Sequence, residues 1–322
     1  MATAKELDLS GIVAELRKGG VDPEQVARLM CDAVVDSYRR LVADDQNVRA
    51  DLNFDTGILH LYSGDIDDPL ALPTGDAARQ AAQAARQSVS RFLGERRIEE
   101  IIRTGDARRN ELVDGVVETL QGKVWMLRLL GDMWGLLPPE EQARNEKLRR
   151  GEHLKVIVLG GRRRTSDAVI VVSRTHPLLL QRLLEREVPE LLRHEIEIKA
   201  IAREPGVRSK VAVASNVEAI DARGACIGPK GVRHRAVTSE LGVEQLQIIN
   251  WSDDPAQYVA NALAPAEAIS VTVDEETRTA TVIVAPDKLS LAIGKGGENV
   301  RLVAKLTSWR VDINPVADQA PG

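Results

Sequence analysis

Two short glycine-rich segments constrain this chain more than any other feature of its sequence. The first reads Gly228-Pro229-Lys230-Gly231, and the second, 66 residues further on, reads Gly294-Lys295-Gly296-Gly297. Each segment lies between two stretches with helical character, and each is followed by a short apolar stretch typical of a strand. This repetition predicts two copies of one domain in tandem, because self-similarity at a fixed spacing is the signature of a repeated structural unit.

The two copies share one order of predicted elements. Each predicts a helix, two strands, a helix that ends at the first glycine of the loop, a second helix and a last strand. A Gly-x-x-Gly loop between two helices, set beside a small sheet, is typical of the KH domain, here in its type II α/β form. We therefore predict one KH domain at 176–250 and a second at 251–316, with the helix before the first loop over 216–227.

The loops point to single-stranded nucleic acid as the ligand. A glycine pair lets a phosphate backbone approach the protein main chain and the amides at the start of the next helix, and lysines add charge pairing. An alternative is that both loops are only helix-capping turns. The predicted RNA-binding residues are Ile227, Gly228, Pro229, Lys230, Gly231 and Arg233 in the first copy, and Ile293, Gly294, Lys295, Gly296, Gly297 and Arg301 in the second.

A further basic segment precedes the first loop. Arg208 and Lys210 follow a Pro-Gly turn between two predicted strands, and we include both among the RNA-binding residues. The alternative is an ordinary charged turn.

Residues 106–175 have a different pattern, with five short apolar stretches separated by Gly, Pro or charged residues. Five short strands in this length predict a small OB-fold barrel. Trp125 and Trp134 stand out because aromatic residues make up only 3% of the chain. We predict that they stack on RNA bases; the alternative is that both fill the barrel core.

Residues 1–105 predict an α+β domain. Asp22-Pro23 is typical of a helix start, Asp55-Thr56-Gly57 is typical of a hairpin turn, and an alanine- and arginine-rich stretch predicts a further helix up to about residue 104. Residues 317–322 are expected to form a disordered tail. The whole chain is therefore predicted to be a multidomain α+β protein.

Composition and charge exclude several classes of protein. The formal net charge is −5, so any nucleic-acid contact must be local. No apolar run of 18 residues and no signal peptide is present, which predicts no membrane contact and a cytoplasmic location. The two cysteines and five histidines are scattered, and no nucleophile motif occurs. We expect no catalytic residues, no metal, no cofactor and a monomer.

Several longer stretches resemble the NusA family of bacterial transcription elongation, termination and antitermination factors. They are "SRTHP" (173–177), "REVPEL" (186–191), "REPGVRSKVAV" (203–213), "GACIGPKGVR" (224–233), "IINWSDDPAQYVANALAPA" (248–266) and "LSLAIGKGGENVRL" (289–302). The resemblance covers nearly the whole chain and implies an RNA polymerase-binding domain at 1–105, followed by the barrel and KH domains, which hold nascent RNA. It also implies a role in pausing, termination and antitermination, and other Nus factors as partners.

Two other functions remain open at this point. One is an RNA-binding protein of ribosome assembly or RNA metabolism that does not contact polymerase. The other is an RNA-degrading enzyme, which would need a separate catalytic domain with metal-binding carboxylates. Residues 1–105 are too short and poorly patterned for such a domain.

Overall fold

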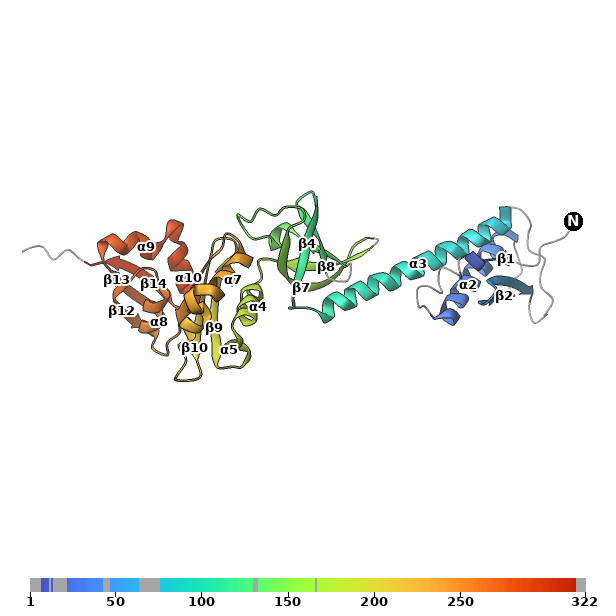
Figure 1. Cartoon of the computed structure of the whole chain (residues 1–322). Helices are drawn as coiled ribbons and strands as arrows, with labels where there is room; N and C mark the ends of the chain where they lie inside the picture. The colour runs from blue at the N-terminus through green and yellow to red at the C-terminus, as the bar shows by residue number, and fades with distance from the viewer. Residues whose placement is uncertain are drawn as a thin grey trace, which may run out of the picture. The chain divides into compact units, whose positions relative to one another are not determined.

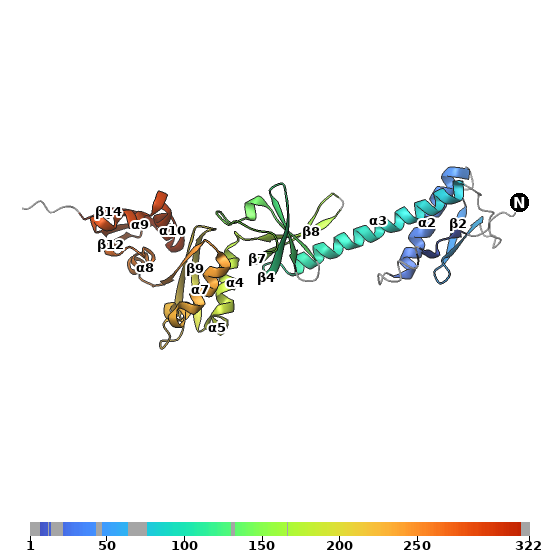
Figure 2. The same cartoon turned by 45° about the horizontal axis from the view of Figure 1, so that its top comes forward.

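The computed structural model describes residues 7–11, 13, 22–42, 47–63, 76–129, 133–165 and 167–316 (Figures 1 and 2). The chain forms two compact units. The first comprises Met1–Glu100 with Thr165–Asp167, and the second comprises the remainder. The predicted tail at 317–322 lies outside the described residues.

In the first unit a three-stranded antiparallel sheet packs with helices. Its strands are β1 (Leu7–Asp8), β2 (Val48–Asn53) and β3 (Ile58–Ser63), in the order β1-β3-β2. The predicted hairpin is confirmed, since β2 pairs with β3 across the expected turn. Helix α2 (Pro23–Val42) buries one apolar stripe, formed by Val26, Met30 and Val34, against this sheet.

Helix α3 (Asp76–Ala107) is one continuous helix (Figure 1). Val89 contributes to the core of the first unit, whereas Ile101 packs against the barrel core of the second. A Cβ atom on Gly161 of the barrel would lie 2.3 Å from the Ile102 Cα, so the last turns of α3 pack directly on the barrel backbone.

The predicted five-stranded barrel is closed. Its strands are β4 (Leu112–Gln121), β5 (Val124–Leu129), β6 (Trp134–Leu137), β7 (His153–Arg163) and β8 (Ala168–Ser173). Their order is β4-β5-β6-β8-β7, with a parallel pair at β6 and β8 and antiparallel pairs elsewhere. This is the order of a five-stranded Greek-key barrel, as the OB-fold prediction requires.

The first KH-like domain begins with α4 (Pro177–Glu187) and α5 (Pro189–Leu192). The chain continues as β9 (Ile196–Glu204), β10 (Arg208–Ser215), α6 (Ala222–Ile227), the 3₁₀ turn η2 (Pro229–Gly231), α7 (Val232–Leu241) and β11 (Gln245–Asn250). Strand β10 is central, antiparallel to β9 and parallel to β11. The predicted helix at 216–227 is too long, because Ser215 and Asn216 make turn contacts with Val217 and His194 and the helix starts only at Ala222.

The second domain repeats this arrangement. Its elements are α8 (Pro255–Ala262), β12 (Ala268–Asp274), β13 (Thr279–Val284), the 3₁₀ turn η3 (Pro286–Lys288), α9 (Leu289–Ile293), the 3₁₀ turn η4 (Lys295–Gly297), α10 (Glu298–Thr307) and β14 (Arg310–Pro315). Strand β13 is central, antiparallel to β12 and parallel to β14.

The two KH-like domains share a hydrophobic core. One face of the first domain's sheet packs on its own helices, through residues such as Val211 and Val213. The other face presents Ala202 and Ala212, which belong to the core of the second domain. Small side chains at these positions let α10 approach β9 and β10 closely (Figure 1). The two domains are therefore held as one packed body.

A buried arginine connects the barrel to the first KH-like domain through hydrogen bonds. Arg174, 2% exposed, donates to the backbone oxygens of Lys155 in β7 (2.9 Å) and Glu240 in α7 (2.8 Å), and it pairs with Glu146. Removing a buried charge from its partners is costly, so this arginine holds the two domains in a defined arrangement.

Candidate nucleic-acid interface

The two glycine-rich loops have nearly identical backbones. Gly228 has φ/ψ of 74°/169° and Gly294 has 78°/168°. The third loop residue is left-handed in both, with φ of 52° at Lys230 and 57° at Gly296. Two loops that agree this closely, despite different residues at their second and third positions, indicate one conserved geometry within the chain.

Two features favour glycine at the first position of each loop: a positive φ, and neighbouring atoms too close to leave room for a side chain. A Cβ atom on Gly228 would lie 2.7 Å from Cγ of Arg233, and one on Gly294 would lie 2.7 Å from the backbone nitrogen of Asn299. The next helix therefore starts directly against the loop. The first N–H group of each helix donates within its loop, from Val232 to the carbonyl oxygen of Pro229 and from Glu298 to that of Lys295.

An arginine four residues after each loop supports the loop backbone. Arg235 donates to the carbonyl oxygen of Lys230 at 2.6 Å, and Arg301 donates to the carbonyl oxygen of Gly296. These carbonyls belong to the two left-handed residues, so each arginine holds the left-handed turn of its loop in place. Arg235 is absent from the predicted site, although it occupies the position in the first copy of the 66-residue repeat that corresponds to Arg301 in the second.

The middle residues of both loops are open to solvent. Pro229 and Lys230 are exposed in the first loop, as are Lys295 and Gly296 in the second. Beside them lie apolar side chains that a base can contact. Ile293 is 36% exposed and Ile227 is half-buried, and the strongly exposed Val232 and Leu291 are additions that the sequence pattern did not reveal.

Arg233 has a different role from the one predicted. Its guanidinium donates to Glu190 at 3.0 Å and to the carbonyl oxygen of Ala225 at 2.7 Å. Burial opposes ionisation of Glu190, but hydrogen bonds and the Arg233 charge lower the pKa of this carboxyl overall. The guanidinium is thus occupied by protein acceptors and is not free for a phosphate. Asn299 takes the equivalent place in the second domain and donates to Leu263 and Ala292.

The predicted contact of Lys210 with RNA is wrong. This side chain is fully buried, and its ammonium donates to Gln247 (2.6 Å) and to the carbonyl oxygens of Ala262 (2.8 Å) and Ala264 (2.6 Å). It therefore joins β10 of the first KH-like domain to the C-terminal end of α8 in the second. Burial, with a smaller contribution from the Arg208 charge, lowers the pKa of Lys210 to about 7.

Arg208 also lies on β10 and hydrogen-bonds Gln245 of β11 at 2.7 Å. The structure does not bring it to either glycine-rich loop, so it stays outside the site that the loops form.

The two barrel tryptophans differ in environment. Trp125 lies on the same side of β5 as Leu127, is partly buried and packs against the barrel core. Trp134 opposes Arg128 across the ladder and is 46% exposed. Of these two rings Trp134 is the more exposed and the better candidate for base stacking.

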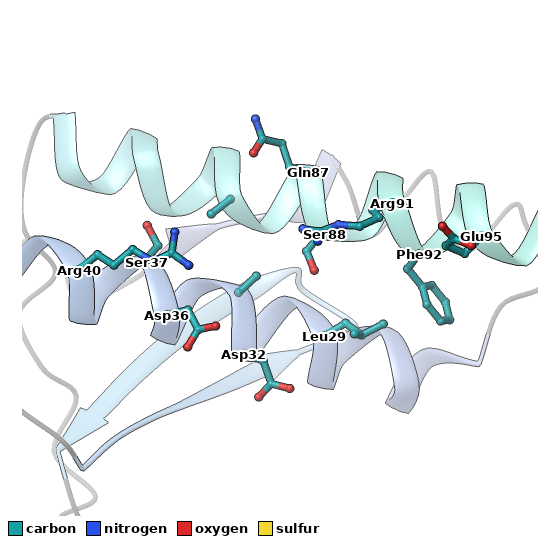
Figure 3. A pocket seen from close by; sticks show the side chains of 12 residues that line it. Leu29, Asp32, Asp36, Ser37, Arg40, Gln87, Ser88, Arg91, Phe92 and Glu95 are labelled. Atoms are coloured by element: carbon teal, nitrogen blue, oxygen red, sulfur yellow. The ribbon is translucent and has the colours of Figure 1, made fainter. Parts of the chain in front are cut away.

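A cleft between α2 and α3 lies in the first unit (Figure 3). Ser88 and Phe92 point from α3 toward α2, and Asp32, Asp36 and Arg40 line the opposite side. Its mixed charges form no arrangement typical of catalysis. Within the described residues, no group of three or more His, Cys, Asp or Glu side chains is placed to hold a metal ion.

The two thiols are also poor nucleophiles. Burial raises the pKa of Cys31 to about 11 and that of Cys226 to about 11, so both stay protonated near neutral pH. Among the helices of the described part of the chain, none combines the length and the apolar composition that crossing a membrane requires.

Comparison with known proteins gives matches to domains and to whole chains. Residues 174–251 match the NusA-like first KH domain family, and residues 255–320 match the NusA-like second KH domain family. The Transcription termination/antitermination protein NusA of Bacillus subtilis is 37% identical, with 94% of this chain and 89% of the relative covered. The protein of that name from Mycobacterium bovis is 37% identical, with 98% and 95% covered. The one from Thermus thermophilus is 40% identical, with 76% and 64% covered.

Proposed function

The chain belongs to the NusA family of transcription termination/antitermination proteins, and we propose that it is a transcription elongation factor without catalytic activity of its own. In this proposal residues 1–105 bind RNA polymerase, and the two KH loops and the barrel bind nascent single-stranded RNA. The protein modulates pausing, termination and antitermination, together with other Nus factors.

The observation that carries the RNA-binding part is the matched geometry of the two loops. Each presents a glycine-supported backbone, an exposed lysine and a nearby apolar side chain, and each is supported by an arginine. A KH loop of this kind clamps about four nucleotides through their backbone. Two loops on one packed body add their contacts, because binding at one raises the effective concentration of RNA at the other.

A net charge of −5 is compatible with this function. Nascent RNA is tethered to the polymerase, so a factor bound to the same polymerase meets that RNA at high effective concentration. Modest local contacts then suffice, and a broad basic surface is not needed.

Reversing the charge of both loop lysines, in Lys230→Glu/Lys295→Glu, should weaken binding of unstructured single-stranded RNA by roughly tenfold or more. Both side chains are exposed, so the fold should be unaffected. The flanking glycines are less suitable targets, because any side chain at Gly228 or Gly294 meets an atom at 2.7 Å. Fluorescence anisotropy at several salt concentrations measures the affinity.

The matched control is Arg186→Glu/Arg193→Glu, which changes the net charge equally on exposed positions of α4 and the turn after α5. Unchanged affinity in the loop variant, or an equal loss in the control, would reject the loops as RNA-binding sites.

The lifetime of a transcriptional pause tests whether residues 1–105 act on RNA polymerase. With purified RNA polymerase on a template that encodes a hairpin pause, the full chain should lengthen the pause. A variant restricted to residues 95–322 should bind RNA but leave the pause unchanged. The cut lies before residue 105 because Ile101 and Ile102 pack on the barrel. A full chain that binds RNA and has no effect on pausing would favour the polymerase-independent RNA-binding protein instead.

A further inference from the structure

A groove lies where the barrel, the first KH-like domain and the second KH-like domain meet in the second unit. The segment after β6 provides one wall, the turn between β9 and β10 provides the floor, and α10 provides the other wall. The lining residues that matter for its chemistry are Pro139, Arg144, Pro205, Val207, Arg301 and Lys305. None of them belongs to a glycine-rich loop.

The floor and the first wall are held together by main-chain contacts. The Arg144 N–H donates to the carbonyl oxygen of Pro205 at 3.2 Å, and the Asn145 side-chain amide donates to the carbonyl oxygen of Gly206 at 3.3 Å. Gly206 has a φ of +75°, and a Cβ atom there would lie 1.6 Å from the carbonyl oxygen of Arg144. The groove is therefore preformed, and a ligand does not need to organise it.

The groove carries cations that the protein does not neutralise. Arg301 pairs with Glu204 at 3.3 Å, and Arg203, which also lines the groove, pairs with Glu244 at 2.9 Å. The exposed side chains of Arg144 and Lys305 have no hydrogen bond or ion pair within the described residues. Among the lining residues, one carboxylate is exposed and could partly offset these two positive charges, that of Glu140.

The cations connect the groove to the second glycine-rich loop. Arg301 touches that loop through the carbonyl oxygen of Gly296 and also lines the groove. Lys305 follows one helical turn later on the same face of α10, and Arg144 lies on the barrel wall. The apolar floor of Pro205 and Val207 suits a ribose or a base, and a cationic rim suits phosphates.

We propose that this groove binds the phosphodiester backbone of single-stranded RNA that extends beyond the second loop, with Arg144 and Lys305 as its phosphate ligands. This inference rests on the proposed function and deepens it, because it adds an RNA site on the barrel side of α10. RNA held by the loops would then continue across the junction of the three domains.

The test compares the full chain with Arg144→Glu/Lys305→Glu, using fluorescein-labelled unstructured RNAs of about 10 and about 24 nucleotides. We expect the variant to bind the longer RNA about tenfold more weakly and the shorter RNA within about twofold of the parent. Its salt dependence on the longer RNA should fall by about 1.4 in the log–log slope, since each phosphate contact on a single strand contributes roughly 0.7. Glu140→Gln should bind the longer RNA more tightly.

The control Arg186→Glu/Arg193→Glu has the same net charge change outside the groove. Equal losses in the two double variants, an unchanged affinity for the longer RNA, or no gain in Glu140→Gln would overturn the groove proposal. The proposal would also be overturned if the groove bound a polyglutamate peptide and Arg144→Glu/Lys305→Glu bound the longer RNA as tightly as the parent does. If the loops bind RNA, Lys230→Glu/Lys295→Glu weakens binding of both the shorter and the longer RNA. Failure of the loop proposal is therefore distinguishable from failure of the groove proposal.

Discussion

Replacing Glu244 by glutamine should destabilise the second unit by about 3–5 kcal/mol, because it breaks a buried ion pair from one side. The side chains of Arg203 and Glu244 are 3% and 1% exposed, and their ion pair measures 2.9 Å. Glu244 also accepts from Ser209 at 2.6 Å and from the Gly206 N–H at 2.8 Å. Glutamine has one acceptor oxygen instead of two, and its NH₂ group would face the donors of Arg203.

The effect should depend on pH in a defined direction. Burial opposes ionisation of Glu244 and by itself would raise its pKa. The hydrogen bonds and positive charge of Arg203, together with hydrogen bonds from Ser209 and from the Gly206 N–H, lower this pKa overall below the ordinary 4.5. The unfolded chain therefore takes up a proton at higher pH than the folded chain does. The stabilisation is fully present above pH 4.5 and is lost as the pH falls below it, so parent and Glu244→Gln should converge in acid.

Urea unfolding followed by tryptophan fluorescence measures this free energy. All four tryptophans, Trp125, Trp134, Trp251 and Trp309, lie in the second unit, so the signal reports on that unit. Glu195→Gln is the matched control, because Glu195 pairs with Arg193 on the surface and its loss should cost less than about 1 kcal/mol. A Glu244→Gln variant as stable as this control would show that the buried pair contributes little.

Replacing Lys210 by methionine should destabilise the second unit by about 3 kcal/mol and loosen the two KH-like domains from each other. Methionine fills a similar volume but donates no hydrogen bond. The carbonyl oxygens of Ala262 and Ala264 and the side chain of Gln247 would lose their donor, and a buried acceptor without a partner costs about 1–3 kcal/mol.

RNA binding provides a second measurement of this variant. Because Lys210 joins β10 to the end of α8, its loss should weaken binding of an RNA that spans both glycine-rich loops, while binding to one loop should change little. Lys288→Met, at a position 50% exposed in the second domain, is the control. Full stability together with unchanged affinity for the spanning RNA would contradict the role of Lys210 as a connection between the domains.

Local sequence patterns predicted the elements that carry the candidate site. Five short apolar stretches separated by Gly, Pro or charged residues identified the barrel strands, and the Asp55-Thr56-Gly57 turn identified the β2–β3 hairpin. The repeated Gly-x-x-Gly segment identified both KH-like domains, and the family resemblance is confirmed by the matches to both domains and to whole chains. These features depend on residues close together in the chain, where spacing and turn chemistry decide the outcome.

The errors in the predicted site concern side chains whose partners are distant in sequence. The charged turn before Lys210 suggests a contact with RNA, yet the acceptors of its ammonium, on Gln247, Ala262 and Ala264, lie 37, 52 and 54 positions further on. One signal was present, since "KVAVAS" is a continuous run without polar alternation, and such runs are typical of strands covered on both faces. Arg233 was misjudged for the same reason, because Glu190 is 43 positions away.

The sequence by itself determined the order of the domains, the position and backbone chemistry of the two loops, and the family. Only the tertiary structure decided which cations remain free to meet RNA. A lysine or arginine has the same charge wherever it occurs in the sequence, but its availability depends on the carboxylates and carbonyls that packing brings to it. Packing buries Lys210 between two domains and leaves Arg144 and Lys305 exposed beside one groove.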